Sequence, residues 1–371
     1  MDFDFSDDQE QLRDAVRKWV DKAYSFDRRR SIEQAGGFDR GVWNELAELG
    51  LCGLYVNEED GGMGMGPVEG MVVMEELGRG IVLEPLSQAL ICGALLSGYA
   101  DETTKARFLP KLCSGEALVV LASQEQGKRY RLDASSCVST AADGGFHLSG
   151  AKSLVPAGDQ ADAFLLSAML DGELALFLVE RLSAGVQTRG YGTQDGGRAA
   201  ELRMHQSPAT LITRHGITAL EHGVDIGIAA LCAQAVGAMD KSLAMTAEYM
   251  NTRKQFGATL SSFQALRHRA ADMKMQVELG RSMSYYASLK LNAPAPERRA
   301  AMARAKYQIG QSMRYVGQQA VQLHGGIGVT NEYMVSHYFK ALTQMEMSYG
   351  DSMHQLGEVS ARMQDTAGVF A

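Results

Sequence analysis

Two segments in the second half of the chain carry residues suited to binding a diphosphate. Arg253 lies in the stretch Tyr249–Gly257, and a planar guanidinium donates paired hydrogen bonds to phosphate oxygens. Gly325 and Gly326 end a long amphipathic pattern, where the missing side chains let a ligand approach the backbone closely. Taken alone, the arginine segment could equally be a solvated helix end. The two segments together favour ligand binding.

Few other residue patterns point to chemistry. His324, beside the glycines, could donate to a phosphate, but a histidine near a helix end more often binds local backbone carbonyls. The sequence contains no HExxH, CxxC, GxSxG or Walker spacing, which excludes the common metal and nucleotide-triphosphate sites. The five scattered cysteines are typical of reduced, buried side chains in a cytosolic protein.

Helical patterns occupy the first part of the chain. Ser6 and Gln9 have the spacing of a capping box, which predicts a first helix running to about residue 24. The stretch Trp43–Leu51 predicts a second helix, and helical patterns resume from Val68 to about Leu112. We therefore expect an N-terminal region built from helices.

Short apolar runs separated by glycine turns predict a small β-domain in the middle of the chain. Ala117–Leu121 is a compact apolar run, and the residues after the turn Asp143–Gly145 alternate as in a strand. The runs Ala163–Ala168 and Leu174–Val179 flank Asp171–Gly172, which predicts a hairpin.

Helical periodicity returns near residue 217. Apolar residues spaced three and four apart form two stripes, from Leu266 to Val277 and from Ile309 to Leu323. The prolines in Asn292–Pro296 separate the two helices, because a proline inside a helix removes a hydrogen bond. Such helices pack side by side in a bundle.

The sequence as a whole predicts a soluble α+β protein with more than one domain. We expect an N-terminal all-α domain at 1–116, a middle β-domain, barrel or sandwich, at 117–213, and a C-terminal four-helix-bundle domain at 214–371. A net charge of −8 argues against a nucleic-acid or anionic-membrane partner. The N-terminus lacks signal-peptide features and no run of 18 apolar residues occurs, so we expect a cytoplasmic chain without a membrane span.

Three segments give the chain a resemblance to the acyl-CoA dehydrogenase family. They are Tyr249–Gly257, Gln322–Gly328 followed by Asn331–Tyr333, and Ser348–Ser352, in the order and spacing of the family. Weaker agreement at Glu75–Arg79 and elsewhere extends the resemblance over nearly the whole chain.

The resemblance implies FAD as cofactor and an oligomer, because in the family Arg253 and the Gln322–Gly326 segment would hold FAD across a subunit interface, with neighbouring protomers contributing to one site. A homodimer or homotetramer, or a heterotetramer with a larger homologue, is expected. The implied cofactor contacts are Arg253, Phe256, Gln264, Gln322, Gly325, Gly326, Ser123 and Gln355.

In the middle β-domain the chain departs from the family. Where members place an aromatic residue and hydroxyls against the flavin ring, this chain has Leu121, Ser123, Gln124, Leu154 and Pro156. The resemblance therefore predicts weakened or different contacts to the flavin ring from this side.

The base that removes the α-proton of an acyl-CoA is the residue on which activity depends. Aligning the last helix with the family puts Asp351 at the position of the usual glutamate. A register shifted by one residue puts Gly350 there instead, and Asp351 then caps the last helix. The alternative base position of a minority of the family is Gly227, with Ile228 beside it where an arginine is usual.

Three functions stay open on this basis. The first is FAD-dependent dehydrogenation of an acyl-CoA to a trans-2-enoyl-CoA, with Asp351 as base and an electron-transfer flavoprotein or similar acceptor. The second is a non-catalytic or partly catalytic subunit of a heteromeric acyl-CoA dehydrogenase, as the similarity to the pimeloyl-CoA dehydrogenase small-subunit type suggests. The third is a flavoenzyme that resembles nitroalkane oxidase and uses aspartate as base.

Overall fold

The computed structural model describes residues 5–142 and 145–366, which form two compact units. One unit, called here the bundle unit, comprises residues up to Arg29, Pro67–Val82 and the chain from Ile228 onward. The other, the barrel unit, comprises Arg30–Gly66 and Leu83–Gly227.

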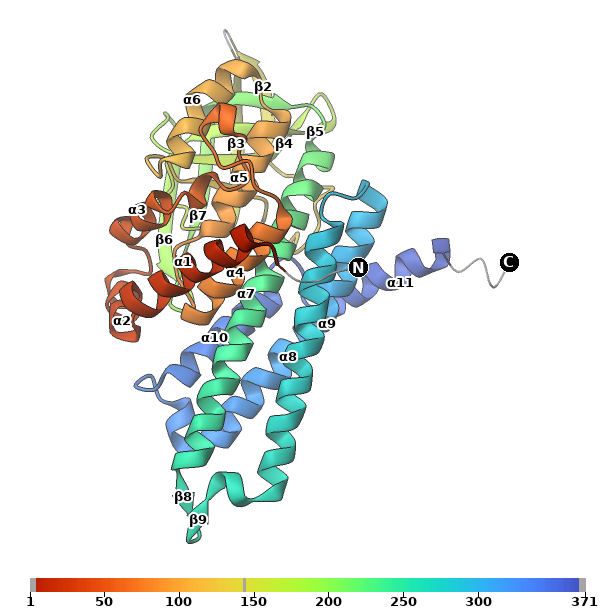
Figure 1. The fold of residues 1–371 in the computed structure, drawn as a ribbon. Helices are drawn as coiled ribbons and strands as arrows, with labels where there is room; N and C mark the ends of the chain where they lie inside the picture. Colours follow the sequence, from red (N-terminus) through yellow and green to blue (C-terminus); the bar gives the residue numbers. More distant parts are fainter. Residues whose placement is uncertain (1–4, 143–144, 367–371) are drawn as a thin grey trace. The chain divides into compact units, whose positions relative to one another are not determined.

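The bundle unit is built from long helices. Their bounds are α1 Asp7–Ala23, α4 Pro67–Gly80, α7 Gly216–Thr252 from Ile228 onward, α8 Gln264–Lys290, α9 Ala295–His324, α10 Met334–Met347 and α11 Ser352–Thr366. Helices α8 and α9 pack side by side, as Figure 1 shows, and α10 and α11 pack on α9. The stripe from Ile309 to Leu323 is buried in this core, and in α8 Met273 and Val277 are fully buried, as their spacing predicts.

Local sequence signals explain how the first helices are placed. Ser6 and Gln9 form the predicted capping box, with the Ser6 hydroxyl accepting from the Gln9 N–H and the Gln9 side chain accepting from the Ser6 N–H. Helix α1 packs on α4, where Arg17 donates two hydrogen bonds to the buried carboxylate of Glu76. A buried carboxylate needs such charged partners.

Helices and a sheet make up the barrel unit. The helices are α3 Arg40–Glu48, α5 Leu86–Tyr99 and α6 Glu102–Cys113, and α2 Phe26–Ala35 continues into this unit from the other. The strands are β1 Val119–Ala122, β2 Val138–Ala142, β3 Gly145–Pro156, β4 Ala163–Leu170, β5 Glu173–Glu180, β6 Val186–Gly192 and β7 Arg198–Thr213. The predicted hairpin at Asp171–Gly172 is confirmed, since β4 pairs antiparallel with β5 across it.

Strand pairing closes the sheet into a barrel. The order β4-β2-β3-β7-β5 returns to β4, because β5 pairs with both β7 and β4 and β2 bridges to β4 at Val138 and Met169. β1 joins β4 in parallel, and β6 joins β7. Helix α5 supports β1, where the Gln88 side chain accepts a hydrogen bond from the Leu121 N–H.

The predicted fold class is confirmed in its order of helical, β and helical parts. The second predicted helix starts and ends earlier than expected, at Arg40–Glu48, because Asp39 caps its first turn and Gly50 adopts a left-handed conformation after it. Of the predicted turn Asp143–Gly145, residues 143 and 144 lie outside the described residues. The domain ranges 1–116, 117–213 and 214–371 stay a prediction.

Helix α7 is long and apolar enough to cross a membrane by length and composition alone. However, 89% of its most apolar window is buried inside the structure, which is typical of a core helix.

Candidate functional site

Helix α7 leads directly into the arginine segment. The Arg253 N–H donates to the Tyr249 carbonyl at 2.8 Å, and the chain then turns through a hairpin formed by β8 Lys254–Gln255 and β9 Ala258–Thr259. Phe256 and Gly257 form the hairpin tip with φ of 54° and 77°, the left-handed pair that a tight two-residue hairpin needs. Arg253 is exposed, and Phe256 is 93% exposed.

The glycine segment follows the end of α9. Gly325 has a φ of 64°, and a Cβ placed on Gly325 or Gly326 would meet no atom within 4 Å, so a ligand could reach this backbone. His324 is buried, and its Nδ1 donates to the Ala320 carbonyl at 2.8 Å. Of its two interpretations, binding a local carbonyl is confirmed.

The second ring nitrogen of His324 is an acceptor rather than a phosphate donor. Burial lowers the pKa of His324, which favours the neutral ring. Because Nδ1 holds the proton that reaches Ala320, Nε2 carries the lone pair. Nε2 is buried without a hydrogen-bond partner among the described residues.

Ring stacking joins the arginine and glycine segments within one protomer. The Tyr249 ring stacks on the His324 ring, with ring centroids 4.5 Å apart and an interplanar angle of 25°. The Tyr333 ring also contacts His324, with ring centroids 5.2 Å apart. A single protomer presents both segments, because α7 and α9 end side by side. The expectation that neighbouring protomers contribute to one cofactor site stays a prediction.

These residues fit a dinucleotide diphosphate. An exposed guanidinium supplies N–H donors that phosphate oxygens accept, and the unobstructed glycine backbone lets the diphosphate approach closely. Gln264 and Gln322 are exposed, each on the helix that adjoins one of these segments. Residues on this end of the bundle unit could hold the cofactor that the resemblance implies.

The turn between α10 and α11 contains the two candidate base positions. Asp351 lies directly before α11, and its Oδ1 accepts a hydrogen bond from the His354 N–H at 2.8 Å. Gly350 has a φ of 104° and Tyr349 a φ of 55°. Asp351 thus caps the last helix, which is one of the two roles left open by the sequence.

Gln355, an expected cofactor contact, lies in the first turn of α11 and bonds to the preceding turn. Its side chain is buried, and its Nε2 donates to the Tyr349 carbonyl at 2.8 Å. This bond helps to hold Tyr349 in its left-handed conformation.

In the barrel unit, the two segments expected to face the flavin ring lie side by side. The Gln124 carbonyl accepts a hydrogen bond from the Ser153 N–H at 2.9 Å, which joins the end of β1 to β3. Ser123 is half-buried, and Leu154 is 52% exposed with a φ of 52°. A strained backbone that exposes an apolar side chain is common at binding surfaces.

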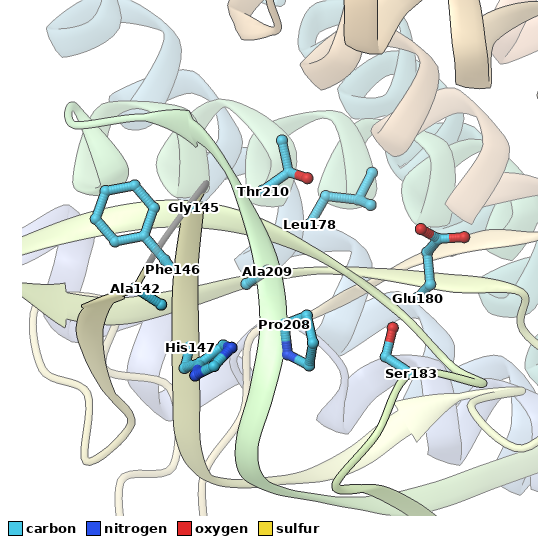
Figure 2. A pocket seen from close by; sticks show the side chains of 10 residues that line it. All are labelled: Ala142, Gly145, Phe146, His147, Leu178, Glu180, Ser183, Pro208, Ala209 and Thr210. Atoms are coloured by element: carbon cyan, nitrogen blue, oxygen red, sulfur yellow. The ribbon is translucent and has the colours of Figure 1, made fainter.

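A shallow pocket on the barrel does not coincide with the segments expected to contact the flavin. It has a volume of about 220 Å³, and Figure 2 shows His147 from β3, Glu180 from β5 and Ser183 at its wall. The Glu180 carboxylate already accepts a hydrogen bond from Arg107 at 2.6 Å. Cofactor pockets are generally larger, and none of the expected flavin contacts lines this one.

Comparison with known families settles the relationship. The sequence profile of the acyl-CoA dehydrogenase N-terminal domain matches residues 6–116, and that of the C-terminal domain matches residues 214–364. The chain belongs to the acyl-CoA dehydrogenase family. It is accordingly an FAD-dependent oxidoreductase of the type that acts on CH–CH bonds of acyl-CoA thioesters.

Known acyl-CoA dehydrogenases match the chain over its full length. Acyl-CoA dehydrogenase FadE27 of Mycobacterium tuberculosis is 27% identical over 99% of this chain and 100% of its own. The ChsE4-ChsE5 complex from Mycobacterium tuberculosis has a TM-score of 0.91 and 25% identity, covering 99% of this chain and 100% of that one. The Tcur3481-Tcur3483 steroid ACAD has a TM-score of 0.90 and 27% identity, covering 97% and 98%.

Proposed function

We propose that this chain is the FAD-binding subunit of a heteromeric acyl-CoA dehydrogenase, in which a larger homologous chain supplies the base. The observation that carries the proposal is the role of Asp351 as a helix cap. Its Oδ1 is directed into the first turn of α11 by the bond from the His354 N–H at 2.8 Å. A base must instead direct its oxygen at the proton that it removes.

The alternative register supplies no carboxylate either. Gly350 has no side chain, and a Cβ added there would lie 2.5 Å from both His354 Cδ2 and Gln355 Nε2. The side chains of α11 therefore fill the space that a residue at position 350 would need. In this proposal Arg253 and the glycine segment would hold the diphosphate of FAD, which would supply the acceptor for the β-hydrogen when bound.

The relatives support an assembly of two different chains. One solved relative is a complex of ChsE4 with ChsE5, and another names Tcur3481 together with Tcur3483. The similarity to the pimeloyl-CoA dehydrogenase small-subunit type points the same way.

We also propose a substrate class, an electron acceptor and a cellular compartment. We favour a medium-length, ω-carboxylated or otherwise bulky acyl-CoA, with electrons passing to an electron-transfer flavoprotein or a similar acceptor. Five buried thiols suit a reducing cytoplasm.

The test compares the chain alone with the chain co-expressed with a larger homologue, following flavin absorbance after acyl-CoA addition. We expect bleaching only with the partner. Asp351→Asn should keep the rate within about twofold, because asparagine caps as well as aspartate, while Asp351→Ala should lower stability by about 1 kcal/mol.

The opposite outcome would establish the second candidate, a self-sufficient dehydrogenase with Asp351 as base. In that case the chain alone bleaches, and Asp351→Asn slows bleaching by about 100-fold or more. Oxygen consumption with a nitroalkane, but none with acyl-CoA, would identify the nitroalkane-oxidase-like alternative.

A further inference from the structure

The turn Ser348–Ser352 has a backbone that its own sequence does not favour. Tyr349 and Gly350 both adopt left-handed conformations, with φ of 55° and 104°. A non-glycine residue in this region persists only where surrounding contacts hold it. Besides the Gln355 bond to Tyr349, two contacts with one face of helix α9 hold this turn.

Lys306 on α9 binds the backbone of the last turn of α10 and the middle of the turn Ser348–Ser352. Its side chain is fully buried, and Nζ donates to the Glu346 carbonyl at 2.8 Å and the Gly350 carbonyl at 3.1 Å. Burial lowers the pKa of Lys306 to about 8, while Cys232, Glu346 and Asp351 favour its charged form. The ammonium is thus mostly protonated at neutral pH, and its bonds to the carbonyls are charge-assisted.

Gly310 lies four residues after Lys306 on α9 and faces Ser352, the last residue of the turn Ser348–Ser352. A Cβ on Gly310 would lie 2.4 Å from Ser352 Oγ, so only glycine leaves room for this hydroxyl. Ser352 Oγ donates to Glu346 Oε1 at 2.7 Å, and the Ser352 N–H donates to the same oxygen at 2.9 Å. Lys306 and Gly310 therefore secure the turn from the same helix face.

We propose that Lys306 and Gly310 are positioning residues that hold the turn Ser348–Ser352 in the shape required for dehydrogenation. The functional half of this inference rests on the proposed function, whereas the fixation of the turn does not. Sequence reasoning missed Lys306. The available signal was a lysine within the apolar stripe of α9, where Met302, Ile309 and Met313 are buried.

The first test measures backbone hydrogen exchange of the peptide covering residues 346–356 in the purified full chain. Lys306→Met should raise its exchange rate about tenfold or more, because a buried charged anchor is lost. Met302→Val, a buried change one turn earlier on α9, serves as the control for general destabilisation. It should lower the thermal midpoint while leaving the exchange of this peptide unchanged relative to other bundle-unit peptides.

A double-mutant cycle tests Gly310 even if Lys306→Met fails to fold. Gly310→Ala should raise exchange of the same peptide about tenfold in the presence of Ser352 but less than threefold in a Ser352→Ala background. The fixation of the turn would be overturned if Gly310→Ala raised hydrogen exchange of this peptide equally with Ser352 and with Ser352→Ala. It would also be overturned if a folded Lys306→Met chain showed the same exchange of this peptide as Met302→Val.

The second test measures turnover of the assembled holoenzyme. Lys306→Met and Gly310→Ala should lower kcat about tenfold with less than a threefold change in KM for the acyl-CoA, whereas Met302→Val should change neither. If these two variants kept a normal kcat while hydrogen exchange of the turn peptide rose, the positioning role would be overturned. Failure of the wild-type chain to bind FAD would refute the proposed function while leaving the exchange result intact.

Discussion

At the scale of single residues, a buried ion pair fixes the segments expected to face the flavin ring. Lys152 Nζ lies 2.7 Å from Glu125 Oε1 and 3.1 Å from Ser167 Oγ, and the lysine side chain is fully buried. Glu125 also accepts hydrogen bonds from Ser135 Oγ at 2.6 Å and from the Ser136 N–H at 2.7 Å. Since Glu125 follows Gln124 and Lys152 precedes Ser153, the pair secures the link between β1 and β3.

Breaking this pair should destabilise the chain strongly. Lys152→Met leaves the Glu125 carboxylate buried without its cation, which should cost about 3–5 kcal/mol in urea unfolding. Glu125→Gln combined with Lys152→Met should recover most of that loss, because no unpaired charge remains. If the single variant costs no more than the double variant, the pair does not hold the segments.

The same pair predicts a pH dependence. Burial alone raises the pKa of Glu125, but hydrogen bonds from Lys152 and Ser135 outweigh it and lower the pKa to about 2. A carboxylate whose pKa is depressed on folding stabilises fully above its ordinary value of 4.5, and this stability is lost as pH falls toward 2. Thermal midpoints between pH 5 and about pH 2 should therefore fall less steeply in the double variant than in the wild type.

At the scale of elements, helices α4 and α7 meet backbone to backbone. A Cβ on Gly237 would lie 1.8 Å from the Glu75 carbonyl oxygen, and one on Gly78 would lie 2.0 Å from the Gln234 carbonyl oxygen. The two glycines thus place α4 on α7, the helix that continues to Arg253.

Gly237→Ala should force these helices apart and lower the free energy of unfolding by about 2–3 kcal/mol. The matched control is Gly98→Ala in α5, where an added Cβ meets no atom within 4 Å. That control should stabilise the chain by about 0.5–1 kcal/mol through helix propensity alone. Equal effects of the two substitutions in chemical denaturation would contradict the close contact.

At the scale of the whole molecule, the expected cofactor contacts lie largely on the surface of a single protomer. Arg253, Phe256, Gly325 and Gly326 are exposed, while the histidine between them is buried against Tyr249. Such a surface suits a cofactor that a second chain also contacts, as the proposed function requires.

Arg253→Met should weaken FAD binding to the assembled protein about tenfold or more, because a charge-assisted bond to phosphate contributes about 1.5–3 kcal/mol. Titration of flavin fluorescence measures this change. Arg269→Met removes an equally charged, exposed side chain that contacts Gln319 and should change the affinity less than twofold. Indistinguishable affinities for the two variants would exclude Arg253 from the cofactor site.

The sequence by itself determined the order of helical, β and helical parts, the capping box at Ser6 and the hairpin at Asp171–Gly172. These features depend on residue spacing over a few positions, so local rules suffice. The tertiary structure alone decided that Asp351 caps α11, that Lys306 binds the turn and that the arginine and glycine segments meet at one end of the bundle unit. Each of these depends on which residues distant in sequence meet in the folded chain, and spacing along the chain carries no measure of that.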